Sequence, residues 1–286
     1  MMLYDIFAKI KSCDKVFTKA ERKVANFVLE FPREALYMSI TDLASRCGVG
    51  DTSVFRFCKT LKLNGYQDFK MTLAQSLSSS EGAYSMTLSD EINLGDSTDE
   101  VCQKLLRTDI DALNQTLDRM DPNDIQRAVD MIKNARMIHF FGVGSSGITA
   151  LEAKNKFARI LPNVASAQDS HMQAMSSALL NEHDLAIAFS YSGSTKDVLE
   201  ILKRAKQNKA KTICVTHYAE SPMTAYADIV LLCSANEGPF QGGSLSAKVA
   251  QLYLLDVLYT EYFKQNFAIC DYNKKLTTQS IASKLL

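Results

Sequence analysis

The sequence predicts a two-part α + α/β protein: a helical N-terminal region with a helix-turn-helix, then a doubly wound parallel sheet. The 286 residues exceed one typical domain, and 47% of them are hydrophobic, enough for two cores. Apolar residues recur at helical spacing up to about residue 134, and short apolar runs alternate with helical segments beyond it. We therefore expect a first domain over residues 1–77, a linker and connecting helix over 78–121, and a second domain over 122–286.

Four amphipathic segments predict the helices of the N-terminal region, because their apolar residues recur every three or four positions. The predicted helices cover residues 19–30, 41–47, 51–61 and 67–77. Pro32 ends the first, and Ser39 or Thr41 is expected to cap the second. Gly48-Val49-Gly50 separates the second from the third.

The rest of the chain changes from linker to alternating strands and helices. Residues 76–99 are rich in serine and acid without a sustained period, which predicts a linker. The predicted strands are residues 137–141, 164–167, 185–189, 212–215 and 229–233. The predicted helices are residues 98–117, 123–134, 148–161, 172–180, 196–208 and 247–263. Such alternation predicts a parallel sheet covered on both faces, whose ligands bind at the carboxyl ends of the strands.

Composition and charge narrow the class of protein. The longest apolar runs are strand-length, well short of the roughly 20 residues of a membrane span, and no secretory signal is visible, so we expect a cytoplasmic protein. The seven cysteines form no C-x-x-C pair, which argues against a disulfide framework or a zinc site. Residues 1–75 hold 12 basic and 8 acidic residues, a net of +4, whereas residues 76–120 hold 3 and 9, a net of −6. A modestly basic head before an acidic connector is typical of a small DNA-reading domain.

The helices over residues 41–47 and 51–61 are typical of a helix-turn-helix, whose second helix enters the major groove. Arg56 could pair with a guanine or hold a phosphate. The residues expected to face DNA are Asp51, Thr52, Ser53, Arg56 and Lys59, and the expected buried side is Val54, Phe57 and Leu61. The spacing alone is equally compatible with an ordinary helical bundle whose short polar residues are caps.

Three stretches of this region resemble the N-terminal domain of the bacterial RpiR family of regulators. They are residues 39–44 (SITDLA), 54–59 (VFRFCK) and 65–70 (GYQDFK). The resemblance covers most of residues 1–77 and implies a partner of double-stranded operator DNA. Gly50 stands where the family usually has a serine cap, a change worth only a few tenths of a kcal/mol.

Two hydroxyl-rich loops follow the first and third predicted strands. The first loop is residues 142–147 (GVGSSG) and the second loop is residues 190–195 (SYSGST). Their amides and the helices that follow can hold an anion. The first also fits G-x-G-x-x-G, with Asp169 roughly where a dinucleotide site needs an acid, but two such loops favour one compact phosphate. The residues expected to bind phosphate are Gly144, Ser145, Ser146, Ser190, Ser192, Gly193 and Thr195.

The two loops are similar to those of the SIS (sugar isomerase) domain, a resemblance that runs from about residue 122 to residue 263. It implies a phosphorylated sugar as effector, with no cofactor and no metal. His171 could read a sugar hydroxyl or be a polar residue at a helix start, and Lys248 stands where the family more often has arginine or is simply solvated. The two residues favour an amino-sugar or hexose phosphate. Glu152 is expected to pair with Lys156.

Together the resemblances imply a transcriptional regulator of carbohydrate metabolism, acting as a homodimer or higher symmetric homo-oligomer that a sugar phosphate controls. A sugar-phosphate isomerase or lyase is the main alternative, with His171 or Glu152 as general base. A third interpretation, a dehydrogenase, is supported by the glycine-rich loop alone. An enzyme has no evident use for a helix-turn-helix, so no catalytic residue is predicted.

Overall fold

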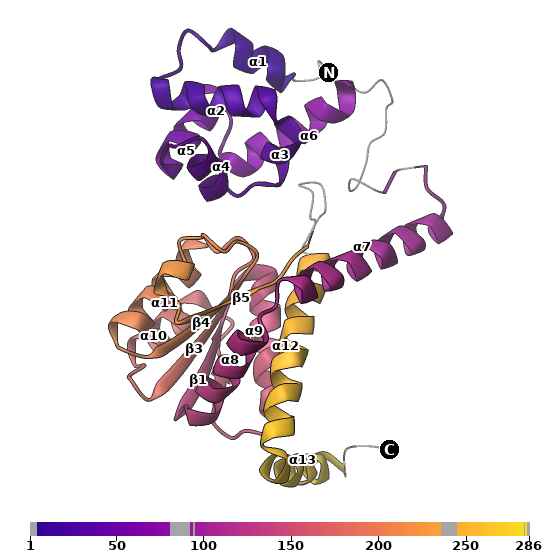
Figure 1. The fold of residues 1–286 in the computed structure, drawn as a ribbon, viewed down its shortest axis with the longest axis vertical. Helices are drawn as coiled ribbons and strands as arrows, with labels where there is room; N and C mark the ends of the chain where they lie inside the picture. Colours follow the sequence, from indigo (N-terminus) through magenta and orange to yellow (C-terminus); the bar gives the residue numbers. More distant parts are fainter. Residues whose placement is uncertain (1–4, 81–91, 94, 236–244, 283, 285–286) are drawn as a thin grey trace. The chain divides into compact units, whose positions relative to one another are not determined.

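The computed structural model describes residues 5–80, 92–93, 95–235, 245–282 and 284 of the chain (Figure 1). Residues 109–235 and 246–286 form one compact unit, and the N-terminal helices form another. Half of the predicted linker, residues 81–91 and 94, lies outside the described residues. Its predicted start is wrong, because residues 76–80 continue a helix, whereas the helix predicted to begin at Thr98 does begin there.

The N-terminal unit is helical, as predicted. Its helices are α1 (Ile6–Ser12), α2 (Lys19–Glu30), α3 (Pro32–Tyr37), α4 (Ile40–Arg46), α5 (Asp51–Thr60) and α6 (Tyr66–Ser80). Their apolar faces meet in one core, in which Phe57 and Phe69 are fully buried and their rings lie 5.5 Å apart edge to face. Ser39 caps α4 and Asp42 returns the bond, so the capping prediction for Ser39 is confirmed.

Two helices of this unit are absent from the prediction, each for a local reason. α1 is a single short stretch with too few residues to show a period, although Ile6 and Ile10 bury completely. Pro32 was expected to end the helix before it, and it does, but it also occupies the first position of α3. Proline is accepted there because the first turn has no partner for its missing N–H.

The second unit has a five-stranded, all-parallel sheet in the order β2-β1-β3-β4-β5, which confirms the predicted fold class. The strands are β1 (Met137–Phe141), β2 (Val164–Ser166), β3 (Asp184–Phe189), β4 (Lys211–Thr216) and β5 (Ile229–Leu232). The helices are α7 (Thr98–Asp118), of which the residues from Asp109 onward belong to this unit, α8 (Pro122–Asn134), α9 (Gly144–Phe157), α10 (Ser170–Ala178), α11 (Lys196–Gln207), the 3-10 turn η1 (Thr224–Tyr226), α12 (Ser246–Gln265) and α13 (Phe267–Ala282).

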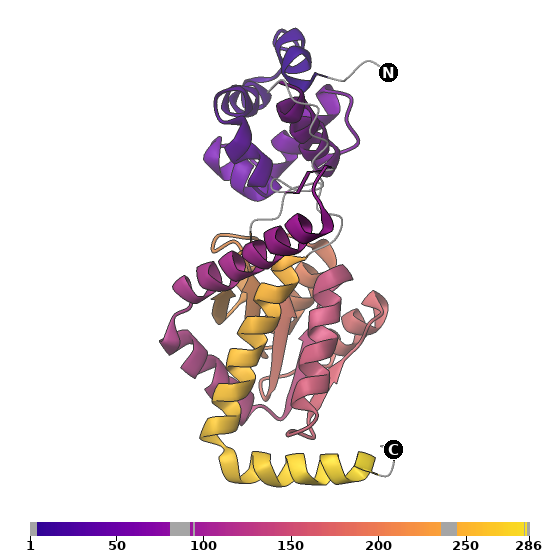
Figure 2. The same ribbon diagram turned by 90° about the vertical axis from the view of Figure 1, so that its right-hand side faces the viewer.

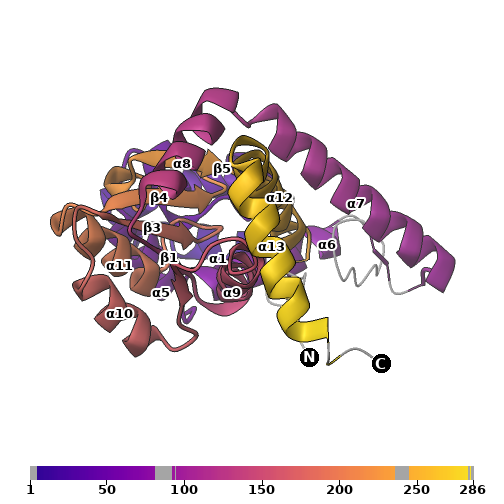
Figure 3. The same cartoon turned by 90° about the horizontal axis from the view of Figure 1, so that it is seen from below.

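Helices cover both faces of the sheet (Figure 3). α8, α9 and α12 cover one face, and α10 and α11 cover the other. All six residues of β3 are buried, as expected for a central strand with a helical layer on each side. This arrangement places the ends of β1 and β3 next to each other at one edge of the sheet.

The last helix, α13, follows α12 almost directly and turns away from its axis (Figure 2). It was not predicted, because its apolar residues are spread around the helix instead of forming one stripe. Cys270 is its buried residue, while Phe267 and Tyr272 are 62% and 58% exposed. None of the helices in the described ranges is both long and apolar enough to cross a lipid bilayer.

Candidate functional site

The helix-turn-helix is built from α4 and α5 with residues 47–50 between them. Val54, Phe57 and Leu61 are buried, so the predicted inner side of the second helix is confirmed. Gly50 is the N-cap of α5 and provides no side-chain bond. The Asp51 carboxylate accepts from Thr41 Oγ1 at 3.1 Å and so links α4 to α5.

The predicted DNA-facing residues differ in how free their side chains are. Thr52 and Arg56 are exposed, Ser53 is half-buried, and Asp51 has the Thr41 contact. Lys59 donates to the Asn64 carbonyl at 2.7 Å, and its ammonium lies 5.3 Å from the centre of the Phe55 ring. Arg56 therefore presents the exposed guanidinium of α5, whereas Lys59 is partly engaged within its own domain.

The first loop leaves β1 and enters α9, which begins at Gly144 with φ +57°. Ser145 and Ser146 therefore sit in the first turn of the helix, where backbone N–H groups lack helical partners. Ser146 Oγ accepts from Gln251 Nε2 at 3.3 Å, and the buried Gln251 also accepts from Thr149 Oγ1 at 3.0 Å. α12 thus reaches the first loop, a contact that sequence reasoning missed.

The second loop leaves β3, the strand beside β1, and leads into α11. Ser190 and Thr195 hydroxyls lie 3.2 Å apart, and Ser192 Oγ accepts from Ser194 N at 3.3 Å. Gly193 has φ +60°, and its carbonyl accepts from Met223 N at 3.0 Å. The two loops therefore end adjacent parallel strands, as predicted.

The serines and threonine of these loops are not simply helix caps. Within these fully described helices, the N-cap positions are Val143 for α9 and Thr195 for α11, and neither makes a side-chain capping bond. Capping hydroxyls normally accept from the second or third N–H of the helix. Both helix ends instead leave first-turn amides for another acceptor.

The two positive-φ glycines are expected to differ sharply when replaced by alanine. A Cβ at Gly144 meets nothing within 4 Å, whereas a Cβ at Gly193 would lie 2.4 Å from Ser221 Cβ. Gly144→Ala should lower the free energy of unfolding by about 1–2 kcal/mol for the left-handed backbone alone. Gly193→Ala should add roughly 1–3 kcal/mol of steric cost. Urea unfolding of both variants checks this, and equal losses would contradict the tight packing at Gly193.

The other two residues predicted to contact the sugar phosphate, Lys248 and His171, lie on α12 and α10. Lys248 is half-buried, one turn before Gln251 on α12, and therefore shares the helix face that reaches Ser146. His171 is exposed near the start of α10. Asp169 caps α10 by accepting from Met172 N at 3.0 Å, a structural role for the acid that a dinucleotide site would have used.

The predicted pairing of Glu152 with Lys156 is wrong. Lys156 forms its ion pair with Asp256 of α12. The i,i+4 spacing permits a pair within α9, but the neighbouring helix offers a carboxylate that the sequence spacing does not reveal.

Sequence reasoning also missed a partly buried cluster beside the second loop. The Tyr191 hydroxyl donates to the Ala235 carbonyl, and its ring stacks on His217 with centroids 4.9 Å apart. The His217 carbonyl accepts from Arg119 Nη2 at 2.8 Å, and Arg119 Nη1 donates to Ser234 Oγ at 2.8 Å. Burial, followed by the charge of Arg119, lowers the pKa of His217 to about 4, so its imidazole is neutral at neutral pH.

The helix α7 is fixed to the same cluster. Thr116, on its last turn, accepts from Ser234 N at 3.0 Å, and Arg119 follows directly after the helix. We name this group, Tyr191, His217, Arg119, Ser234 and Thr116, the α7 anchor. It connects the second loop to the helix that leads toward the N-terminal region.

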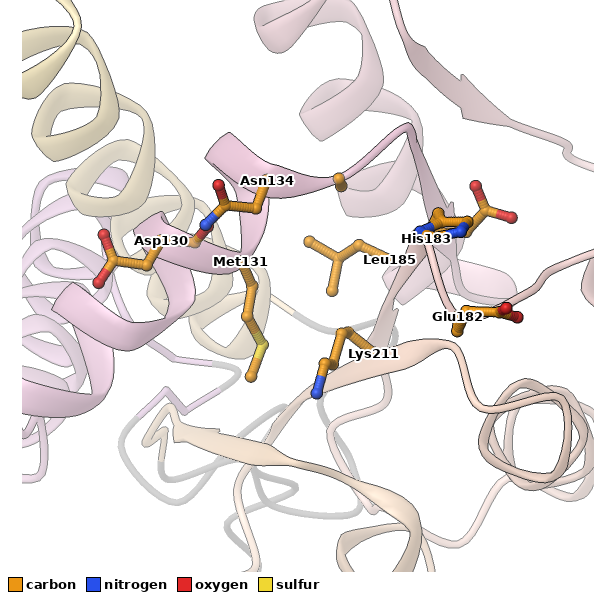
Figure 4. A pocket seen from close by; sticks show the side chains of 9 residues that line it. Asp130, Met131, Asn134, Glu182, His183, Leu185 and Lys211 are labelled. Carbon is orange, nitrogen blue, oxygen red and sulfur yellow. The ribbon is translucent and has the colours of Figure 1, made fainter.

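A hollow of about 350 Å³ lies at the other edge of the sheet, by the amino ends of β3 and β4 (Figure 4). Leu185 is central, while the carboxylates of Asp130 and Glu182 point away from it. Asp184, at the start of β3, is paired with Arg136 at 2.8 Å. The polar groups that line the hollow do not converge on one point. The hollow therefore lacks the convergent hydrogen-bond donors of the two hydroxyl-rich loops.

Comparison with known proteins assigns both halves of the chain. The family description "Helix-turn-helix domain, rpiR family" matches residues 4–80, and "SIS domain" matches residues 131–261. An HTH-type transcriptional regulator of Haemophilus influenzae is 36% identical over 89% of this chain and 88% of its own length. The HTH-type transcriptional regulator HexR of Pseudomonas aeruginosa is 33% identical over 90% and 88%.

A solved structure supports the same arrangement. The Vibrio vulnificus NanR protein, complexed with ManNAc-6P, matches 98% of this chain and 99% of its own with a TM-score of 0.83 and 28% identity. The fold and its two loops therefore define a helix-turn-helix regulator with a SIS domain. The chain belongs to the RpiR family of HTH-type transcriptional regulators.

Proposed function

We propose that a phosphorylated hexose or amino sugar binds the two hydroxyl-rich loops and controls the binding of operator DNA by α5. The observation that carries this proposal is the pair of uncapped helix starts, α9 and α11, at the ends of neighbouring strands. Free amides and neutral hydroxyls on both sides of one space suit a compact dianion such as a phosphate monoester. The ManNAc-6P in the NanR structure supports this class of effector.

We assign the following roles to the individual residues as part of this proposal. Gly144, Ser145, Ser146, Ser190, Ser192, Gly193 and Thr195 receive the phosphate. Lys248, on the α12 face toward the first loop, supplies a positive charge, and His171 reads the sugar from the start of α10. On α5, Arg56 reads a base, while Thr52 and Ser53 contact the DNA backbone with Asp51 and Lys59 at the edges. The site is a sensor without catalytic residues.

The regulator acts as a homodimer or higher symmetric oligomer in the cytoplasm, on a pseudo-palindromic operator. The effector can switch DNA binding only by as much as its affinities for the two states differ. A panel of hexose and amino-sugar 6-phosphates, screened by thermal shift, identifies the effector, because a ligand of the native state raises stability with concentration. Operator binding to the chain's own upstream DNA is then measured with and without it.

The outcomes separate the classes of function. Effector-dependent binding of the upstream DNA, with no new sugar phosphate after prolonged incubation, supports a sensor. Conversion of a panel member into a different sugar phosphate would instead support an isomerase or lyase that uses the same site. Absence of binding by every phosphorylated sugar would overturn the proposed effector class.

We further propose that the α7 anchor carries the effector signal from the second loop to α7. Tyr191 lies between two of the proposed phosphate-binding serines, and its hydroxyl and ring both belong to the anchor. A contact network of this kind transmits a signal only if a change in the network alters the coupling between effector binding and DNA binding. Arg119 and Thr116 provide its link to the helix.

Tyr191→Phe is expected to uncouple the two sites, because it removes the bond to Ala235 and keeps the stacked ring. Effector affinity, measured by calorimetry, should stay within about twofold, since the lost hydroxyl bonds protein and not phosphate. The effect of effector on operator affinity should shrink by up to the roughly 5–150-fold of typical allosteric couplings. Tyr226→Phe, in η1, is the control and should respond as the parent does. An undiminished response in Tyr191→Phe would remove the anchor from the signal.

A further inference from the structure

Gln173 is a fully buried glutamine whose side chain holds the backbone at the start of the first loop. It lies on α10 and is 0% exposed. Its Nε2 donates to the Gly142 carbonyl at 2.8 Å, and its Oε1 accepts from the Gly142 N–H at 3.2 Å. A primary amide carries the same donor and acceptor as a peptide group, so Gln173 bonds Gly142 as a neighbouring strand would.

Gly142 needs this partner because the pairing of β1 with both of its neighbours ends before this residue. The pairing of β1 ends at Phe140 on the β2 side and at Phe141 on the β3 side. Gly142 follows directly and is buried, so its N–H and C=O require partners from outside the sheet. Gln173, 31 positions further along the chain, satisfies both.

The position of Gly142 also determines the position of the loop that follows. A Cβ on Gly142 would lie 2.6 Å from the Ser146 carbonyl oxygen and 2.8 Å from its carbon. The two backbones are therefore in direct contact, and Gly147 N bonds the Val143 carbonyl at 3.2 Å within the same turn. A shift of Gly142 must move Ser146, whose hydroxyl is one of the proposed phosphate donors.

We propose that Gln173 is a positioning residue of the effector site: its amide fixes Gly142 and thereby holds Ser145 and Ser146 where they receive a phosphate. This inference rests on the proposed function of the loops. Gln173 is buried and both ends of its amide bond Gly142, so it acts through the loop and does not touch the effector. Without it, fewer molecules have a competent loop, and apparent affinity falls by that fraction.

Gln173→Glu tests this role, because the substitution keeps the shape of the side chain. The bond to the Gly142 carbonyl then forms only when the new carboxyl group is protonated. The protonated carboxyl donates to the Gly142 carbonyl as the amide does, whereas the carboxylate sets an oxygen against it. Burial favours the protonated form up to higher pH than in water. The ratio of variant to parent Kd for ManNAc-6P should therefore be near one at about pH 5 and roughly ten- to hundredfold at about pH 8. Gln173→Ala should bind ManNAc-6P more weakly than the parent at both pH values.

The controls isolate the bond to Gly142 from charge and from ligand ionisation. Gln168→Glu adds the same carboxyl at an exposed position just before α10 and should give a flat ratio. Asp169 and His171 are the charged or titratable groups at the start of α10, and Arg204 of α11 lies against the helix, where its guanidinium donates to the Ala174 carbonyl. They and the effector phosphate are the same in every variant, so their titration cancels in the ratio.

A second measurement detects the hydrogen bonds between residue 173 and Gly142 without any ligand. The sequence has 12 glycines, so [15N]glycine labelling gives few amide signals. The Gly142 signal should titrate in Gln173→Glu and stay fixed in Gln168→Glu. A Gly142 signal that does not titrate overturns the inference, and so does a titrating signal with a flat affinity ratio.

Failure of the proposed function has a different signature. Inorganic phosphate serves as the second probe, measured on the same variants. If the parent binds neither ManNAc-6P, inorganic phosphate nor any sugar phosphate of the panel, the effector site itself is refuted, and a titrating Gly142 signal then marks Gln173 as a structural residue only. A pH-dependent ratio with either probe supports the positioning role.

Discussion

Arg56→Ala is expected to lower specific operator affinity by roughly 1–3 kcal/mol, about five- to 150-fold, the scale of one lost base contact. Arg56 is exposed on α5, while the inner side of that helix, with Val54 and Phe57, is fully buried. The truncation therefore removes a group that faces outward and leaves the core intact. Fluorescence anisotropy with operator and scrambled duplexes measures the specific and non-specific affinities.

Two further variants decide what Arg56 does on DNA. Arg56→Lys keeps the charge and loses the planar fork, so a base contact predicts a large specific loss and a phosphate contact predicts a small one. Arg22→Ala, on α2, removes the same charge outside the helix-turn-helix, and its exposed pair with Asp14 is worth at most about 1 kcal/mol. Unchanged operator affinity in folded Arg56→Ala would refute the assignment of α5 as the reading helix.

Ser192→Asp is expected to abolish effector binding, because it sets a carboxylate against the phosphate in the second loop. Ser192 Oγ accepts from Ser194 N at 3.3 Å and keeps its own proton to donate. Ser192→Ala should cost roughly 1.5–3 kcal/mol, about one to two decades in Kd, for a lost bond to a charged group. Operator binding by both variants should no longer change with sugar phosphate.

The measurement is calorimetric titration of effector into each folded variant, followed by an operator shift with and without it. Ser280 is exposed on α13, outside the two loops. The control variant Ser280→Asp adds the same charge there and should respond to the effector as the parent does. If both Ser192 variants keep the parent's response, the effector binds elsewhere. Loss of DNA binding in the absence of effector would point instead to a folding defect.

The sequence by itself determined the elements whose signals are local. The five strands could be predicted because strands with helices on both faces are short, continuous apolar runs, as the fully buried β3 is. α5 could be predicted down to its buried side because Val54, Phe57 and Leu61 follow the helical period. The two hydroxyl loops could be placed together because parallel strands bring their carboxyl ends to one edge.

Only the tertiary structure decided which side chains hold those loops. Gln173 contacts Gly142 across 31 positions and Gln251 contacts Ser146 across 105, and no periodic pattern marks either glutamine. Lys156 pairs with Asp256 on another helix, and the His217 carbonyl accepts from Arg119, 98 positions earlier in the chain. These contacts depend on how helices pack on the sheet, and packing joins residues whose separation in the chain carries no local signal.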